Sequence, residues 1–446
     1  MRPPGSLWPR GGLWRHADFL KLWSAETVSQ FGWQVSGLAL PFVAIVTLDV
    51  SAFEVALLGV VEFAPFILVT LPAGVLVDRL PRRPILIAGD LARAVLLVTI
   101  PIAYAFDVLT IWQLYAVGFA VGVCTVFFDV AYQSYLPSLV KRDQLVEGNS
   151  KLEISRSGAQ IGGPGLAGVI IEILTAPVAI LADAISFVAS GLFLLGIRKH
   201  EPRPERAEPG KQGPGIKAEL MEGLRYVLGH RLLRWIAAST ATYNFFGNLM
   251  FAILLVYVVR DLGMSAGVVG VILAVGNFGF LLGALTATRI SNRIGVGRAI
   301  VAAQAGSFAT LLIPLAPQDA DGAIPFLVAA LTIGGFGVVV YNVTQLSLRQ
   351  AITPERLQGR MNSVMRFIVW GVIPLGNLAG GAIASLYGLR TAIWIGAIGS
   401  CLAALPVLLS PVRSVVRVPE PAEGAVAEDE ALVGPGVAPP PVDERV

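Results

Sequence analysis

The chain has 446 residues, of which 55% are hydrophobic and only 14% are charged, and its formal net charge is +3. A water-soluble protein of this composition would lack the polar residues needed to cover its surface, so we exclude that class. The small positive charge is no sign of a nucleic-acid partner, because the basic residues are better explained as signals of membrane topology. The composition predicts a polytopic membrane protein.

Twelve apolar stretches are long enough to cross a bilayer. A spanning helix needs roughly 20 predominantly apolar residues. In chain order, the expected spans are 19–47, 54–77, 84–106, 110–136, 149–172, 176–197, 234–259, 267–288, 297–317, 323–346, 361–387 and 391–410. The predicted fold class is therefore an all-α polytopic membrane protein with twelve transmembrane helices.

The positions of Lys and Arg predict how the chain is oriented. Almost all of them fall before the first span, after the last span or in every second loop, whereas the alternate loops contain only Arg260 and Arg390. Basic residues collect on the cytoplasmic side of membrane proteins. We therefore expect a multi-pass protein of the cytoplasmic (inner) membrane with both termini in the cytoplasm.

Two segments of the first half recur in the second half. The arginine-rich residues 74–84 have a weaker copy at 288–298, and residues 143–168 resemble 355–381 at nearly the same spacing. Such duplication predicts two pseudo-symmetric bundles of six helices in parallel orientation.

The repeat and the composition together predict the organisation of the chain. The linker is rich in Pro and charged residues before a short amphipathic stretch, and the last residues are rich in Pro, Ala and Glu without apolar periodicity. The expected parts are a cytoplasmic N-terminal segment (1–18), two bundles (19–197 and 234–410), a cytoplasmic linker (198–233) with an amphipathic helix over 216–228, and a disordered cytoplasmic tail (411–446).

The sequence contains no nucleotide-binding loop, metal-ligand cluster or nucleophile motif. Its two cysteines, Cys124 and Cys401, lie far apart in apolar stretches and form no metal motif. We therefore expect no enzymatic activity, no cofactor and no bound metal.

The loop at 74–84 resembles the signature that the major facilitator superfamily carries between its second and third helices. The matching residues are Gly74, Asp78, Arg79, Arg82 and Arg83. Further segments resemble the branch that includes the enterobactin exporter and macrolide efflux proteins, namely 22–23, 29–32, 71–74, 132–140 and 149–168. The resemblance implies a monomeric secondary transporter, driven by the proton gradient or, as the alternative, by the sodium gradient. Its partners would be a small amphipathic substrate and the lipid bilayer.

The same resemblance implies a gate at this loop. Asp78 would cap a neighbouring helix and pair with a basic residue while the transporter faces outward. The alternative is that the arginines are only topology signals. In the second copy, Thr288 and Asn292 replace the glycine and the acid. The gate there should be weaker or depend on Arg293 and Arg298.

A second motif lies in the fifth span and contains Gly162, Gly163, Pro164 and Gly168. It resembles the glycine–proline signature of superfamily antiporters, which implies export coupled to an incoming proton. The alternative is ordinary packing, since small residues let helices approach closely and proline bends them.

Charged side chains inside spanning helices are costly, so they indicate a function or a mutual pair. Asp90 with Arg93 and Glu153 with Arg156 have i,i+3 spacing, which predicts structural or gating pairs on one helical face. The other charges predicted to lie within spans are Glu26, Glu62, Asp129, Asp183 and Arg366.

Among these residues, Glu62, Asp129 and Glu26 are the candidates for proton coupling. Burial favours the neutral form of a carboxyl group, which can then load and release a proton. The exporter branch often carries an acid directly after Gly32, where this chain has Trp33. That departure weakens any inherited proton site in the first helix.

The substrate cavity is expected between the halves near mid-membrane. Its apolar walls with scattered amides and phenols suit a large amphipathic ligand. The expected lining residues are Gln30, Gln34, Tyr243, Asn244, Asn248, Asn277, Tyr341, Asn342 and Gln345. For each of them the alternative is a hydrogen bond between packed helices.

The prediction favoured by these patterns is proton-coupled efflux of drug-, macrolide- or siderophore-like molecules by alternating access. An importer or lipid-like flippase on the same scaffold is the first alternative. A non-transporting membrane sensor is the second, and it would require a folded output domain that neither end of this sequence predicts.

Overall fold

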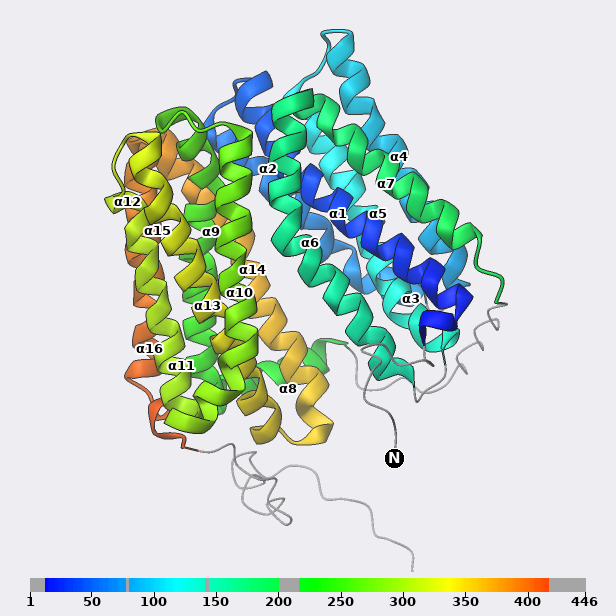
Figure 1. The fold of residues 1–446 in the computed structure, drawn as a ribbon. Helices are drawn as coiled ribbons and strands as arrows, with labels where there is room; N and C mark the ends of the chain where they lie inside the picture. Colours follow the sequence, from blue (N-terminus) through cyan, green and yellow to red (C-terminus); the bar gives the residue numbers. More distant parts are fainter. Residues whose placement is uncertain (1–12, 78–79, 141–143, 200–215, 417–446) are drawn as a thin grey trace, which may run out of the picture.

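The computed structural model describes residues 13–77, 80–140, 144–199 and 216–416 (Figure 1). Within these ranges the chain is helical between short turns and contains no strand. Asp78 and Arg79, two of the predicted gating residues, lie outside the described residues.

Seven helices form the first half. They are α1 (Ala17–Phe42), α2 (Ala52–Leu68), α3 (Thr70–Val77), α4 (Arg82–Ala105), α5 (Ile111–Leu139), α6 (Leu145–Leu174) and α7 (Ala176–Leu195). The last turn of α1 continues as a π-helix over Val43–Thr47.

The second half follows the linker helix α8 (Ile216–Gly229). Its helices are α9 (Leu233–Val256), α10 (Ala266–Ile294), α11 (Val296–Ala305), α12 (Leu312–Leu315), α13 (Ala320–Ile352), α14 (Glu355–Tyr387), α15 (Leu389–Leu402) and α16 (Ala404–Leu408). A π-helix over Tyr257–Asp261 extends α9, and a 3₁₀ turn over Gly306–Leu311 joins α11 to α12.

Among the described residues, 11 helical segments are long and apolar enough to span a membrane. The predicted span at 54–77 differs, because it is broken at Val69 into α2 and α3. Pro72 has no amide hydrogen for the Leu68 carbonyl, and its ring clashes with that carbonyl in a regular helix. The Ala73 amide resumes helical bonding with the Val69 carbonyl at 2.8 Å. The twelfth span is therefore a pair of short helices.

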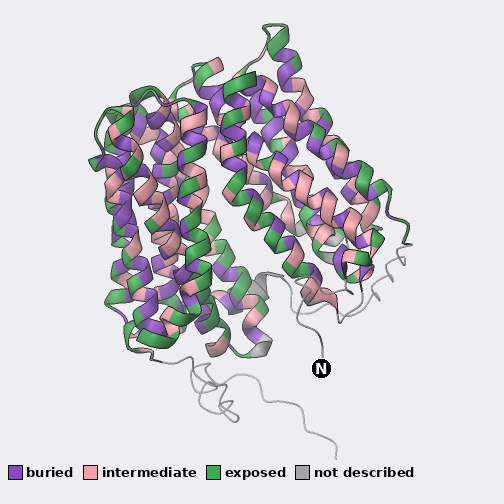
Figure 2. Ribbon diagram, in the orientation of Figure 1, coloured by how far each residue is buried: buried purple, intermediate pink, exposed green. Residues whose placement is uncertain are grey.

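The helices form two bundles (Figure 1). In the first, α7 packs on α1 and α4, and in the second α9 packs on α14 and α15 while α10 packs on α13. Many large apolar side chains lie outside these packed contacts; for example, Trp112 is 74% exposed and Val95 is 69% exposed (Figure 2). Exposed apolar surface of this extent is expected where a protein faces lipid.

The two halves repeat each other in backbone detail. The π-helices at Val43–Thr47 and Tyr257–Asp261 stand at the same spacing as the two arginine-rich loops. Left-handed backbone conformations recur as well: Asp49 (φ 47°) matches Gly263 (φ 66°). The duplication seen in the sequence thus extends to individual turns.

Two peripheral segments dock on the second half. The Tyr226 hydroxyl of α8 donates a hydrogen bond to the Ile352 carbonyl at 3.1 Å. The Gly297 amide donates to the Val415 carbonyl at 2.7 Å. The expected disorder from residue 411 is therefore wrong for 411–416, which includes a 3₁₀ turn over Pro411–Ser414. Gly297 permits this close approach because a Cβ there would meet the Val412 carbonyl oxygen. Residues 417–446 lie outside the described residues.

Candidate functional site

The loops between α3 and α4, between α10 and α11 and between α13 and α14 mark one end of the molecule, which we call the basic end. The opposite end carries the turns after the two π-helices. Near the opposite end, α6 and α10 approach backbone to backbone. A Cβ on Gly168 would lie 2.5 Å from the Ala266 carbonyl oxygen, and one on Gly270 would lie 2.5 Å from the Pro164 carbonyl oxygen. Gly168 and Pro164 of the predicted antiporter-like motif thus form the contact between the halves.

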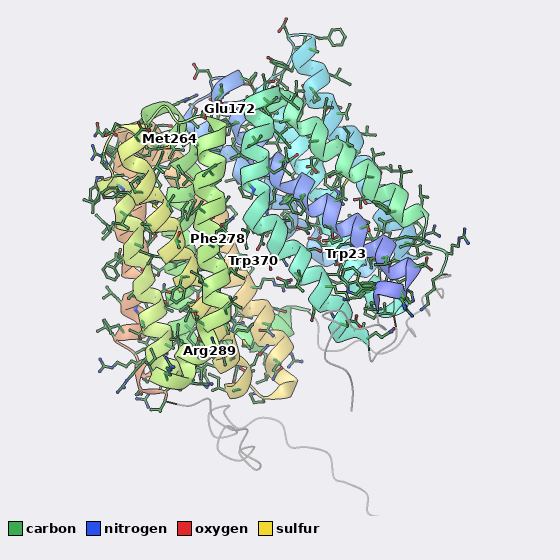
Figure 3. The ribbon with its side chains drawn as sticks, viewed as in Figure 1. Trp23, Glu172, Met264, Phe278, Arg289 and Trp370 are labelled. Carbon is green, nitrogen blue, oxygen red and sulfur yellow. The ribbon has the colours of Figure 1, made fainter. Side chains whose placement is uncertain are left out.

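Further contacts between the halves extend from this end toward mid-depth. The Glu172 carboxylate accepts a hydrogen bond from the Gly267 amide at 3.0 Å. On the other side, α2 meets α14, with the rings of Phe63 and Trp370 centred 6.1 Å apart. Trp370 lies between the bundles, and the helices of the two bundles diverge from there toward the basic end (Figures 1 and 3). The contacts between the halves thus lie near the opposite end and at mid-depth.

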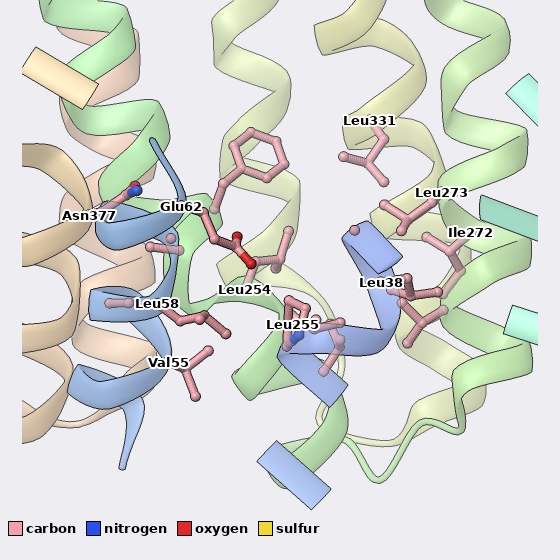
Figure 4. Close-up of a pocket in the computed structure, with 18 of the residues that line it drawn as sticks. Leu38, Val55, Leu58, Glu62, Leu254, Leu255, Ile272, Leu273, Leu331 and Asn377 are labelled. Atoms are coloured by element: carbon pink, nitrogen blue, oxygen red, sulfur yellow. The ribbon is translucent and has the colours of Figure 1, made fainter. Parts of the chain in front are cut away.

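A cavity of about 280 Å³ lies between the two halves. Six helices line it: α1, α2, α9, α10, α13 and α14. Its walls are almost entirely apolar, with Leu38, Leu255 and Ile272 among the lining side chains (Figure 4). Glu62 is the single ionisable group among the lining residues, and Asn377 is the single amide.

Glu62 is positioned by glycines of α5. A Cβ on Gly118 would lie 3.0 Å from the Glu62 Cγ, and one on Gly122 would lie 2.9 Å from the Glu62 carbonyl oxygen. These glycines let α2 lie close to α5 while the carboxyl group reaches the cavity (Figure 4). Within the described residues this carboxylate has no hydrogen bond or ion pair. It is therefore available to a ligand.

The predicted cavity residues lie elsewhere. Four of them, Tyr243, Asn244, Tyr341 and Asn342, line a smaller cavity of about 50 Å³ inside the second half, together with Gln304. None of the predicted set lines the larger cavity. The predicted residues therefore do not line this cavity between the halves, and their role in substrate binding stays a prediction.

Hydrogen bonds account for most of these polar groups. Asn244 donates to the Val369 carbonyl of α14 at 2.9 Å, and Asn248 donates to the Asn244 carbonyl at 2.8 Å. Tyr341 shares a hydrogen bond of 2.7 Å with Thr240 of α9. A polar side chain on a spanning helix satisfies its hydrogen-bonding groups equally well in a cavity or against another helix, so sequence position does not distinguish the two.

Three further members of the predicted set are also hydrogen-bonded to protein groups. Asn277 donates to the Gln160 carbonyl across the two halves. Gln30 donates to Glu26 at 2.7 Å, and Gln345 accepts from Arg349 at 3.2 Å. Gln34 packs on Gly163 of the antiporter-like motif, whereas Gly162 has only Phe31 within contact distance.

The described gating residues differ from one another. Arg83 donates to the carbonyl oxygens of Leu194 (3.1 Å) and Leu195 (2.7 Å) at the end of α7. A cation at a helix C-terminus satisfies free carbonyls and interacts favourably with the helix dipole. Arg82 is half-buried. A Cβ on Gly74 would meet no atom within 4 Å, so packing alone does not require glycine there.

In the second copy of the loop, Arg293 and Arg298 are both exposed at the basic end. Arg293 lies in the last turn of α10, where a positive charge is favourable.

One of the two predicted charge pairs is present. Arg93 Nη2 donates to Asp90 Oδ1 at 2.5 Å, and both side chains are buried. The guanidinium carbon lies 4.4 Å from the ring centre of Phe128 and 4.1 Å from that of Phe187. Two aromatic faces thus hold the cation inside the first bundle.

The other predicted pair is absent. Glu153 and Arg156 are both exposed on α6, and no ion pair joins them in the described structure. Asp129 and Arg366, expected within the membrane interior, are exposed as well. Arg366 lies 5.1 Å from the ring centre of Trp370, the residue that lies between the bundles. Water can solvate charges on such a surface, which removes the need for a partner.

The structure places three charged residues, to which the sequence patterns assigned no role, in buried positions or between the halves. Asp183 of α7 is fully buried, and its position in a span was the only signal. Arg349 of α13 is buried and donates to Asn362 of α14 at 3.0 Å. Arg260 joins the two halves at the opposite end, and its signal was its rarity among the loops of that side.

Comparison with known proteins decides the family. A family profile described as "Transmembrane secretion effector" matches residues 12–430. The chain belongs to this family of major facilitator transporters. It is 26% identical over 359 residues to multidrug efflux pump Tap of Mycolicibacterium fortuitum, covering 76% of this chain and 83% of that protein. It is 22% identical over 414 residues to macrolide efflux protein A of Streptococcus pyogenes, covering 89% and 97%.

A solved structure has the same fold as this member of the transmembrane secretion effector family. The crystal structure of a bacterial homologue of the iron transporter ferroportin in its inward-facing state superposes with a TM-score of 0.68 at 16% identity, covering 90% of this chain and 99% of that one. The protein is thus a membrane transporter with the all-α major facilitator fold, as its sequence predicted.

Proposed function

We propose that this transporter exports amphipathic small molecules, coupled to an inward flow of protons, and binds them in the cavity at Glu62. The observation that supports this is the apolar cavity between the halves with its single carboxylate. Apolar walls bury the body of an amphipathic molecule, and one polar group orients it.

The arrangement of the halves supports transport by alternating access. The α6–α10 contact joins the halves near the opposite end, and the two bundles diverge toward the basic end (Figure 1). The positive-inside rule assigns the basic end to the cytoplasm. In this orientation the diverging side of the two bundles faces the cytoplasm, from which an exporter takes up its substrate (Figure 1).

The relatives support the direction of transport. Two of the matched proteins are named as efflux pumps for drugs or macrolides. We further propose that the protein functions as a monomer in the cytoplasmic membrane, with both termini in the cytoplasm and without a cofactor.

The test is efflux from cells loaded with a panel of amphipathic dyes and macrolides, with and without a protonophore. We expect the wild-type chain to lower dye accumulation, and Glu62→Gln to abolish most of this effect at equal expression. Asp107→Asn is the matched control, because Asp107 is an exposed carboxylate that does not line the cavity and its left-handed backbone suits asparagine.

Two results would contradict the proposal. Higher accumulation with the wild-type chain would indicate import. Unchanged export by Glu62→Gln would show that neither this carboxylate nor the cavity around it takes part in transport.

A further inference from the structure

A second group of buried charges lies inside the first bundle, away from the cavity at Glu62. Asp90 and Arg93 come from α4, and Asp183 comes from α7. Asp90 and Asp183 are 0% exposed and Arg93 is 3% exposed. The group therefore contains two wholly buried carboxyl groups and one buried guanidinium.

The hydrogen bonds of this group leave one carboxyl group without a cation of its own. Arg93 donates to Asp90 Oδ1, to the Gly89 carbonyl at 3.4 Å and to Thr125 at 3.5 Å. Asp183 receives only the hydroxyl of Ser186, at 3.1 Å. Asp90 Oδ2 and Asp183 Oδ2 have no hydrogen-bond partner.

The charges of this group do not balance if both carboxyl groups are ionised. An unpaired carboxylate in a low-dielectric interior is strongly destabilising, so such a group is neutralised instead. Ser36 of α1 faces Asp183 and Ser190 of α7 faces Asp90, but hydroxyl groups carry no charge. A bound proton balances the group.

Arg93 lies against the ring of Phe187, one turn after Asp183 on α7. We propose that Asp183 and the Asp90–Arg93 pair form the proton-binding site of this transporter, and that Asp183 holds the proton in the present conformation. The coupling role of this site rests on the function proposed above. The site is separate from the cavity, so Glu62 contacts the substrate and Asp183 carries the proton.

Two further carboxyl groups of the first half are less deeply buried than this site. Asp129 of α5 is exposed, and Glu26 of α1 is half-buried with Gln30 as its hydrogen-bond donor. Glu26 lies within electrostatic range of Asp129, Arg93 and Asp90. We include Glu26 and Asp129 in the proposed proton route because they are accessible to solvent whereas Asp183 and Asp90 are not.

The charged groups around Asp183 come from three neighbouring helices. Asp90 and Arg93 from α4 lie next to Asp183, with hydroxyl groups from Ser36 of α1 and Ser186 of α7, and Glu26 of α1 and Asp129 of α5 lie on the far side of Arg93. When Asp183 loses its proton, two carboxylates compete for Arg93, which changes the forces between α4 and α7.

Helix α1 connects this site to the substrate cavity. Gly32 lies against Asp183 so closely that a Cβ there would be 2.5 Å from Asp183 Oδ1. Two turns later on the same helix, Leu38 and Pro41 line the cavity. A change of charge at Asp183 therefore acts on a helix that forms one wall of the substrate site.

The first experiment measures the proton itself and needs no substrate. Infrared difference spectra of the full chain in lipid detect the C=O stretch of protonated carboxyl groups. We expect Asp183→Asn to remove one such component near neutral pH and Asp107→Asn to leave the spectrum unchanged. An unchanged component in a folded Asp183→Asn protein would overturn the proposal.

The second experiment measures coupling in proteoliposomes with ethidium, a permanent cation, as the probe. We expect an acidic lumen to drive ethidium accumulation by the wild-type protein. Asp183→Asn should abolish this gradient-driven accumulation but retain exchange of labelled for unlabelled ethidium. Gradient-driven accumulation that survives in Asp183→Asn would overturn the coupling role.

A second variant keeps the test decisive if Asp183→Asn does not fold. Asp90→Asn leaves one carboxylate and one guanidinium, a balanced pair that needs no proton, so it should fold and show the same uncoupling. If the wild-type protein fails to accumulate ethidium under the gradient, the proposed function fails for this probe, while the infrared spectra still decide whether Asp183 holds a proton.

Discussion

Arg260 of the second half binds Asp49 of the first half and thereby joins the two halves at the opposite end. Arg260 Nη2 donates to Asp49 Oδ1 at 2.8 Å and also contacts the carbonyl oxygens of Ile45 (3.1 Å) and Val50 (2.8 Å). One guanidinium thus holds the turn that follows the first π-helix.

The internal repeat shows that this contact is asymmetric. Asp49 occupies the left-handed position that glycine, as Gly263, occupies in the second half. Arg260 occupies the position equivalent to Val46. A non-glycine residue in a left-handed conformation costs roughly 1–2 kcal/mol, although aspartate tolerates it better than most. The bonds to Arg260 give a physical reason for an acid at this strained position.

We predict that Arg260→Ala weakens closure at the opposite end. The ion pair is partly exposed, so it contributes about 1 kcal/mol or less, which corresponds to at most about a fivefold shift in a two-state equilibrium. In a chain without native cysteines, Val55→Cys places a thiol in the cavity. Arg260→Ala should raise its labelling by an impermeant reagent from the opposite side several-fold.

The control for this prediction is Arg390→Ala. Arg390 is the other basic residue of these loops, but it donates to the Pro314 carbonyl within its own half. The Arg390→Ala variant should leave the labelling rate of Val55→Cys unchanged. Equal rates in both variants would show that the bond between Arg260 and Asp49 does not affect closure.

We predict that Gly168→Val disrupts the contact between α6 and α10. Even its Cβ would lie 2.5 Å from the Ala266 carbonyl oxygen, and backbone cannot move aside easily. Cysteines at positions 165 and 274 report on this contact, since the corresponding Cβ atoms lie 3.4 Å apart, near disulfide geometry. Cross-linking should fall several-fold in Gly168→Val.

Gly158→Val on the same helix is the comparison, because a Cβ there meets no atom within 4 Å. Cross-linking between positions 165 and 274 in Gly158→Val should equal that in the double-cysteine protein without a glycine substitution. If Gly168→Val also cross-links fully, the close approach of these two helices does not depend on the glycine.

We predict that Gly32→Ala destabilises the first bundle. The added methyl group would lie 1.9 Å from Ser186 Oγ and 2.5 Å from Asp183 Oδ1. Overpacking of this kind costs about 1–3 kcal/mol. A thermal melt monitored by size-exclusion chromatography should show a midpoint several degrees lower. Gly37→Ala, which lies in open space on the same helix, should melt like the wild type.

We predict that Arg83→Ala destabilises the end of α7 and that Arg83→Lys restores only part of the loss. Arg83 contacts two carbonyl oxygens from two different nitrogen atoms, a geometry that a lysine ammonium cannot reproduce fully. A lost cap of this type costs about 1 kcal/mol. Hydrogen exchange at the amides near Leu194 should be faster in Arg83→Ala than in Arg83→Lys. Equal rates in both variants would argue against capping.

The sequence contains a signal for one break in a helix and for one member of the buried charge group. Pro72 marks the break between α2 and α3 by a known local rule. Asp183 was recognised as a charge within a span, but its companions Asp90 and Arg93 lie on a helix far away in sequence. The i,i+3 rule found the pair within α4 and could not find the third member, because that rule describes one helix only.

The sequence by itself determined the membrane class, the order of the spans, the internal duplication and the family. These properties depend on local hydropathy, on the distribution of Lys and Arg and on short motifs, all of which can be recognised before any helix has a neighbour. Only the tertiary structure decided that Glu62 faces the cavity, that Asn244 bonds to a neighbouring helix and that Asp183 lies against Gly32. The physical reason is that a polar side chain in a membrane must find a partner, and that partner usually belongs to a helix distant in the chain.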